Sequence, residues 1–247
     1  MEDEEGDLNI MKQIKKTDNQ IVFSSDISIT LANSIRRYFN NIPILAIDEL
    51  EISKNESPLY DETIAHRVGL VPLKAGKGKV SDKIELNVKR QGVVYSGDFA
   101  GGPEPVSGKV PLTTLDKGQE IKFKATLTKG KGIDHSKFSP GIMFYRNLVS
   151  LTVDKEFYDE IRRVCPDHEI KEKGQKIVIK DDMAKEIADV CEGIANKAGK
   201  KAEIEESEEL VVTIESFGQM KTKDIFLEAI NVLRSDLKDI SKGAKKI

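Results

Sequence analysis

The feature that most constrains this chain is an apolar row near its C-terminal end. Five apolar residues between 226 and 240 are separated by 4, 3, 4 and 3 positions. A repeat of about 3.5 residues predicts a helix whose apolar stripe packs lengthwise against another helix. One helix cannot bury such a stripe alone, and the spacing does not decide whether the second helix belongs to this chain or to a partner. The row consists of Phe226, Ile230, Leu233, Leu237 and Ile240.

Two further helices are marked by apolar spacing and by residues that start or stop a helix. In 28–39, apolar residues share one helical face, and Pro43 stops the segment. After Ser57, Pro58 predicts the first position of a second helix, which ends at Gly69. The two apolar faces comprise Ile29, Ala32, Ile35 and Phe39 in the first helix, and Tyr60, Ile64 and Val68 in the second.

Alternating apolar residues predict strands elsewhere. The spacing of Leu8, Ile10 and Ile14 predicts the first strand of a hairpin over 8–23. The stretch 71–139 is rich in Gly, Pro and Lys, and its clearest strand is 121–128. We therefore expect the middle of the chain to be mostly β-structure with long loops. Two more strands are predicted over 148–153 and 210–215.

Charged amphipathic helices are predicted within 155–207. Phe157, Ile161 and Val164 share one helical face. A second apolar set predicts another helix, and the highly charged stretch 200–209 predicts a surface connection to the next strand. The second set consists of Met183, Ile187, Val190, Cys191 and Ile194.

Composition excludes several classes of protein. The 247 residues carry 39 Lys and Arg against 42 Asp and Glu, so the net charge of -3 favours neither a basic nor an acidic partner. The longest apolar runs span a few residues, far fewer than the roughly 20 that a membrane-spanning helix needs. The stretch 1–5 is acidic, whereas a signal peptide starts with positive charge. We therefore expect a cytoplasmic protein with no membrane segment.

A metal-dependent hydrolase is one alternative function. Glu62 and His66 lie four residues apart on the predicted helix, and with His135 they are the residue types of a two-His, one-carboxylate metal site. Such a site requires all three side chains to converge in one pocket. No spacing typical of a Ser or Cys nucleophile accompanies them. A self-contained enzyme is therefore poorly supported.

Direct nucleic-acid binding is a second alternative. Arg36 and Arg37 precede two aromatic residues, as in proteins that clamp nucleic acid, but no basic stripe follows them. The Lys-Gly stretches 76–79 and 129–132 lack the spacing of a phosphate-binding loop. We therefore expect any contact with nucleic acid to be indirect.

Longer motifs run along almost the whole chain. Thr30–Arg37, Ala65–Leu73, His135–Gly141 and Glu215–Gln219 follow one another in this order. Together they closely resemble the D-type subunit of archaeal DNA-directed RNA polymerases, the counterpart of the bacterial alpha N-terminal region and of the third subunit of eukaryotic RNA polymerase II. Further matching motifs are Ala46–Ile52, Tyr95–Asp98, Gly118–Ile121 and Gly130–Gly132.

This resemblance implies an α+β fold of three parts. A discontinuous dimerisation domain of strands and two helices would comprise 1–44 and 208–247. A mainly β domain would be inserted at 45–154. The family often carries a small ferredoxin-like α+β insertion, which would lie at 155–207.

The resemblance also implies a noncatalytic assembly scaffold. In the family, the first and last helices pair with a small partner, the L-type subunit in archaea, and the pair nucleates docking of the large catalytic subunits. A small zinc-binding subunit contacts the inserted domain, and the catalytic Mg²⁺ is held by other chains. The implied dimer interface is Ile29, Ile35, Phe39, Phe226, Ile230, Leu233 and Leu237, and the implied large-subunit contacts are Arg36, Arg37, His66, Arg67, His135 and Lys137.

The iron–sulfur cluster that many family members bind is expected to be absent. Cys165–Pro166 resembles the family's Cys-Pro, but the Cys-x-x-Cys-x-x-Cys run is missing around 183–199. A cluster needs about three or four thiolates, and this chain has 2 cysteines. We therefore expect Cys165 and Cys191 to be free thiols, Cys191 to pack on a helix face, and the chain to bind no cofactor.

Overall fold

The structure, a computed structural model, is a mixed α/β fold that describes residues 11–74, 82–166, 168–181 and 187–245. The predictions for Leu8, Ile10, Met183 and the stretches 1–5 and 76–79 lie outside the described residues. The chain divides into two compact units. The first comprises the described residues within Met1–Asn33 and Met143–Ile214, and the second those within Ser34–Ile142 and Glu215–Ile247. The three-part division stays a prediction.

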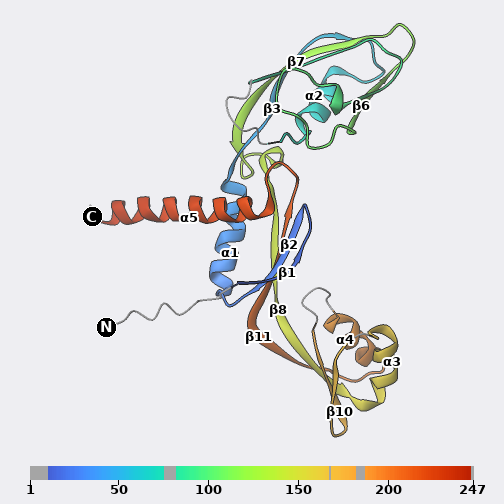
Figure 1. Cartoon of the computed structure of the whole chain (residues 1–247), viewed down its shortest axis with the longest axis vertical. Helices are drawn as coiled ribbons and strands as arrows, with labels where there is room; N and C mark the ends of the chain where they lie inside the picture. Colours follow the sequence, from blue (N-terminus) through green and yellow to red (C-terminus); the bar gives the residue numbers. More distant parts are fainter. Residues whose placement is uncertain (1–10, 75–81, 167, 182–186, 246–247) are drawn as a thin grey trace. The chain divides into compact units, whose positions relative to one another are not determined.

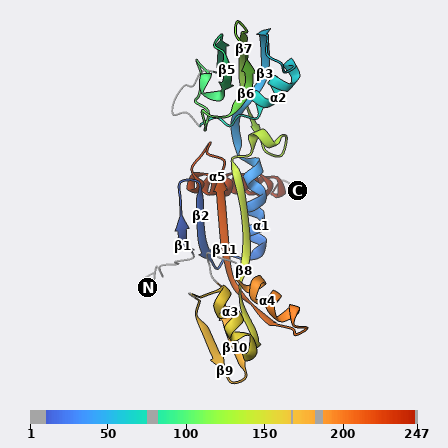
Figure 2. The same ribbon diagram turned by 90° about the vertical axis from the view of Figure 1, so that its right-hand side faces the viewer.

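The first unit is built on a six-stranded sheet (Figure 2). In sheet order its strands are β1 (Met11–Lys16), β2 (Gln20–Ser25), β11 (Glu203–Ser216), β8 (Gly141–Asp154), β10 (Lys176–Lys180) and β9 (Ile170–Lys173). The outer ends of β8 and β11, Gly141–Ile142 and Glu215–Ser216, belong to the second unit. β1 and β2 pair antiparallel, which confirms the predicted hairpin for its described part.

Two helices of the first unit, α3 (Tyr158–Val164) and α4 (Ala188–Lys197), share an apolar cluster with β8 and β10. Leu151 of β8 and Ile161 of α3 are fully buried in it. Val164, predicted on the buried face of α3, is instead 51% exposed. The inward position is taken by Cys165, which lies four residues after Ile161 and is 7% exposed. The helix therefore buries one side chain every turn, as expected.

The prediction of a surface connection over 200–209 is wrong for its greater part, because β11 begins at Glu203. The side chains of 203–208 are exposed, so their charge does not conflict with a strand. Backbone groups pair whatever the side chains are, and the Asn147 side chain adds a 3.1 Å hydrogen bond to the Ser207 carbonyl. Charge alone therefore marks exposure here, and not the absence of a strand.

The second unit contains a three-stranded and a two-stranded antiparallel sheet (Figure 1). The first sheet has the order β3 (Pro43–Asn55), β7 (Ile121–Lys131) and β4 (Lys83–Val88), and the second pairs β5 (Gly92–Tyr95) with β6 (Pro111–Leu115). β3 carries one unpaired extra residue at Asp48 and another at Ser53, where its register with β7 shifts. The predicted strand 121–128 is confirmed as part of β7.

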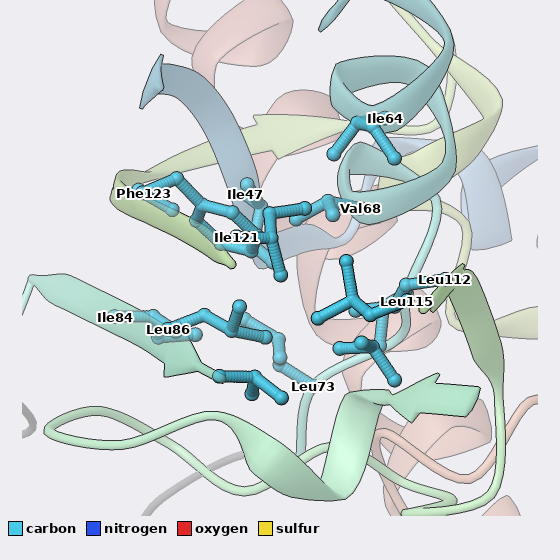
Figure 3. Packing of buried hydrophobic residues seen from close by; sticks show 14 residues of the cluster. Ile47, Ile64, Val68, Leu73, Ile84, Leu86, Leu112, Leu115, Ile121 and Phe123 are labelled. Carbon is cyan, nitrogen blue, oxygen red and sulfur yellow. The ribbon is translucent and has the colours of Figure 1, made fainter. Parts of the chain in front are cut away.

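Helix α2 (Asp61–Gly69) closes the core of this unit against β3 and β6. Ile64 and Val68 of α2 are fully buried with Ile47 of β3 and Phe123 of β7 (Figure 3). Burying one such side chain is worth about 1.5–3 kcal/mol relative to exposing it. The core therefore fixes the position of α2 on its sheet.

The predicted start of this helix at Pro58 is wrong, because α2 begins at Asp61. The Asn55 side chain holds the preceding segment in a turn: its oxygen accepts from the Ser57 amide, and its nitrogen donates to the Leu59 carbonyl. Tyr60, predicted on the apolar face, consequently precedes the helix and is 82% exposed.

The 3-10 turn η2 (Ser96–Asp98), which directly follows β5, is held by a carboxylate. Asp98 accepts hydrogen bonds from the Tyr95 amide at 2.9 Å and from Arg90 Nη2 at 2.8 Å. Partial burial opposes ionisation of Asp98, but these two hydrogen bonds and the positive charge of Arg90 lower its pKa below the ordinary value.

The helices that the sequence predicts as the first and the last are both confirmed. They are α1 (Ile29–Tyr38), followed by the 3-10 turn η1 (Phe39–Asn41), and α5 (Thr222–Ala244). No helix within the described part of the chain is long and apolar enough to cross a membrane.

Candidate interaction surface

The apolar row predicted from spacing lies on α5, and its burial falls along the helix. Phe226 is 8% exposed, and Ile230 and Leu233 are half-buried. Leu237 and Ile240 are 56% and 67% exposed. The row is thus packed within the chain at its start and open at its end. Internal packing therefore applies to the first turns of α5, and an apolar surface open to a partner applies to its last turns.

The end of α1 supplies part of that internal packing. In Figure 1 the first turns of α5 cross the chain at η1, which contacts α5, and the later turns extend away from it. Ile35 and Phe39 are 4% and 2% exposed, so their side chains are already buried in the single chain. Ile29 of the predicted apolar face is not buried, since it is 52% exposed. Leu31, which lies outside that face, is 44% exposed.

A hydrogen bond not foreseen from the sequence joins the two helices. Tyr38 Oη donates to Asp236 Oδ2 at 3.0 Å. This hydrogen bond, with partial burial and the negative charge of Asp236, raises the pKa of Tyr38. Nothing in the spacing of either helix signals a pair 198 residues apart. The bond adds a polar contact to the apolar packing between the end of α1 and α5.

The 3-10 turn η3 (Ser136–Phe138) holds two of the implied contact residues. His135 caps the turn, since its Nδ1 accepts from the Lys137 amide at 3.1 Å. Lys137 Nζ donates to the Ile47 carbonyl and to Asp48 Oδ1, both at 3.0 Å, and lies 5.0 Å from the centre of the Phe138 ring. The Lys137 side chain is only 14% exposed. Its contacts are therefore mainly with β3, at the extra residue Asp48 and the neighbouring Ile47.

The other implied contact residues lie on exposed helix surface. Arg36 and Arg37 are exposed at the end of α1, and His66 is exposed on α2. Arg67 is also exposed, but its Nη1 donates to the Leu112 carbonyl at 2.8 Å and ties α2 to β6. The structure therefore gives Arg67 an internal role. Contact of these residues with another subunit stays a prediction.

The alternative metal site is not assembled. Among the described residues, no group of three His, Cys, Asp or Glu side chains is placed to hold a metal ion. Glu62, His66 and His135 are all among the described residues, so they do not form such a group, and each side chain is exposed. The hydrolase hypothesis loses the geometry it requires.

The two cysteines do not fit an iron–sulfur cluster. Cys165 and Cys191 lie together in the cluster between α3 and α4, and both are buried. Burial, with the neighbouring Cys165, raises the pKa of Cys191 to about 12. Cluster ligands are thiolates, and at least one more would be needed. Two buried thiols are therefore too few to hold a cluster of three or four iron atoms.

Comparison with known proteins supplies what the geometry leaves open. The family model described as the RNA polymerase Rpb3/RpoA insert domain matches residues 29–144. The chain is 30% identical over 237 residues to DNA-directed RNA polymerase subunit Rpo3 of Thermococcus kodakarensis, an alignment that covers 89% of this chain and 91% of that subunit.

Two other relatives align over a similar extent. The chain is 29% identical over 243 residues to subunit Rpo3 of Archaeoglobus fulgidus, covering 89% of this chain and 91% of that subunit. It is 29% identical over 275 residues to DNA-directed RNA polymerase II subunit rpb3 of Dictyostelium discoideum, covering 91% of each chain. These alignments span both compact units.

Proposed function

The chain belongs to the family of RNA polymerase subunits that includes archaeal Rpo3 and eukaryotic Rpb3, and from this premise we propose that it is a noncatalytic assembly scaffold. It pairs with a small partner of the L type, and the pair docks the large catalytic subunits. Catalytic Mg²⁺ is held by carboxylates of those other chains. The proposed location is the cytoplasm.

The observation that carries the pairing is the open end of the α5 row. Leu237 and Ile240 are more than half exposed on a helix whose earlier turns are buried. Apolar side chains aligned along one helix face lose contact with water when a second helix covers them. Ile230 and Leu233, half-buried, extend the same surface toward the body of the second unit. We place the partner's helix along this row. Ile29, in the first unit, is proposed separately as a contact with the same partner.

The large subunits are proposed to contact the exposed residues of the second unit and of the end of α1. Arg36 and Arg37 are the basic groups at the end of α1, and His66 and Arg67 those of α2. His135, which caps η3, is proposed as a further contact with a large subunit. Lys137 is proposed as another such contact, and its hydrogen bond to the Ile47 carbonyl also attaches η3 to β3. A small zinc-binding subunit is proposed to bind the same β-rich body.

The ferredoxin-like part, 155–207, is proposed to be held by packing, without a cluster. Its helices α3 and α4 and strands β9 and β10 enclose an apolar cluster that includes both cysteines. A stoichiometric content of iron and sulfide in anaerobically purified protein would overturn this proposal.

The first experiment is affinity purification of the tagged chain from its own cells. Stoichiometric partners are identified by mass spectrometry, and template-dependent RNA synthesis is measured on the eluate. We expect two large subunits, one small partner and RNA synthesis. A monodisperse chain without these partners would refute the proposed function.

A paired substitution then tests the α5 surface. Leu237→Asp with Ile240→Asp places charge where the partner would bury apolar surface, and both sites are exposed, so the chain should still fold. Losing the burial of two such side chains costs about 3 kcal/mol or more, which weakens pairing at least a hundredfold. Val164→Asp, at a site 51% exposed on α3, is the matched control and should leave pairing intact. Equal copurification of the small partner by both variants would contradict the assigned surface.

A further inference from the structure

Charged residues flank the open α5 row unequally on its two sides. Successive residues on a helix are about 100° apart, so the residue after a row member and the residue before it lie on opposite edges. Arg234 follows Leu233, and Lys238 follows Leu237. Asp236 precedes Leu237, and Asp239 precedes Ile240. One edge of the row is therefore basic and the other is acidic.

Both carboxylates of the acidic edge already interact with residues of the same chain. Asp236 accepts the 3.0 Å hydrogen bond from Tyr38 at the end of α1, and Asp239 Oδ1 lies 2.9 Å from Lys242 Nζ. The basic edge is exposed, and within the described residues no carboxylate forms an ion pair with Arg234 or Lys238. We therefore look to another chain for the charged group that meets this edge.

We propose that the segment covering the α5 row is a partner helix with its own apolar repeat and with carboxylate side chains on the edge that meets Arg234 and Lys238. This inference rests on the proposed function and names the chemistry of its partner. Flanking charges of this kind set partner choice and orientation in paired helices.

A second copy of this chain fits the row less well. In a two-fold pair of antiparallel helices the same edge of each helix meets, which would bring Arg234 and Lys238 against their own copies. In a parallel pair the basic edge would meet the acidic edge, where Asp236 is already bonded to Tyr38 and Asp239 to Lys242. In neither arrangement does the basic edge meet Asp236 or Asp239 without a partner already bound in its own chain, so the charges favour a different chain.

The test measures association of the full chain with the small subunit that copurifies with it. Arg234→Glu with Lys238→Glu should slow association roughly tenfold at low salt, because exposed charges act mainly on the rate of encounter. The difference should nearly vanish at about 1 M salt, where screening acts within about 3 Å. Lys12→Glu with Lys15→Glu, at exposed sites on β1, changes the net charge equally and serves as the control.

A chemical cross-link gives a direct second readout. A water-soluble carbodiimide activates a carboxylate, and the Lys238 amine displaces the urea to form an amide bond. Mass spectrometry should locate the product between Lys238 and an Asp or Glu in an amphipathic helix of the small subunit. A cross-link from Lys238 to a second copy of this chain would overturn the inference.

The two proposals fail in different ways. If no small subunit copurifies, the proposed function fails and this inference falls with it. If the small subunit binds with the same rate and salt dependence in the Arg234→Glu, Lys238→Glu variant as in the control, the proposed function stands and the inference is wrong.

Discussion

Replacing Lys137 tests whether this residue stabilises the fold or contacts another subunit. Lys137→Met keeps most of the apolar stem but removes the ammonium that donates to the Ile47 carbonyl and to Asp48. Ile47 is fully buried, so its carbonyl loses a charged donor away from water, which costs about 1.5–3 kcal/mol. The Asp48 side chain is 46% exposed, so its pair with Lys137 adds only about 0–1 kcal/mol.

Urea unfolding of the full chain measures the loss. With a slope of about 1–3 kcal/mol per molar urea, the midpoint should fall by about 1 M. The chain contains no Trp, so far-UV circular dichroism replaces fluorescence, and hydrogen exchange of peptides from β3 assigns the loss to the second unit. Exchange should accelerate around the extra residue Asp48.

Lys124→Met provides the matched control on the neighbouring strand. The Lys124 side chain is 58% exposed and lies 3.4 Å from Glu85, so its removal should cost at most about 1 kcal/mol. A double-mutant cycle of Lys137→Met with Asp48→Ala should then assign the smaller share of the loss to the carboxylate. If Lys137→Met unfolds like the unaltered chain yet no longer recovers the large subunits, the stabilising role is refuted and the contact role implied by family resemblance is favoured.

Three other predictions concern separate features. Gly130→Ala would place a Cβ 2.5 Å from the Phe138 ring, so it should destabilise the chain by about 1–3 kcal/mol in thermal unfolding, whereas an unchanged midpoint would contradict this close approach. Asp98 has a lowered pKa when folded, so its contribution to stability is complete above the ordinary Asp value of about 3.9 and is lost as pH falls through the lower folded value. Asp98→Asn should therefore flatten the acid dependence of unfolding, and identical acid profiles would argue against this assignment. Cys191, with a pKa of about 12 and no exposed surface, should react with iodoacetamide at pH 8 only after unfolding, and rapid labelling of the native chain would disprove its burial.

Local spacing predicted most helices and their buried faces. Ile35, Phe39 and Ile64 are buried where their spacing placed them, and α5 follows its row throughout. These predictions succeed because side chains three or four residues apart share a face of any helix. Spacing failed at Tyr60, where the hydrogen bonds of Asn55 hold a turn and delay the helix. A local hydrogen-bonded alternative there outweighs the preference of Pro58 for a helix start.

The candidate surface was found in part. The row on α5 was visible in the sequence, but its division into a buried start and an open end depends on η1, which covers only the first turns. The family resemblance gave Lys137 as a contact with a large subunit, which stays a prediction. The hydrogen bonds of Lys137 to the Ile47 carbonyl and to Asp48, 90 and 89 positions away, could not be seen in the sequence. Neither fact is a property of the local pattern.

What the sequence by itself determined is the periodicity of each element, the shortage of thiolates for a cluster and the long ordered motifs that place the chain among RNA polymerase subunits. The tertiary structure decided which apolar residues stay open, that Tyr38 meets Asp236, and that Cys165 and Cys191 share one core. The physical reason is that a repeat records which side chains share a face, whereas burial and pairing depend on segments that are distant in the chain and are brought together only by folding.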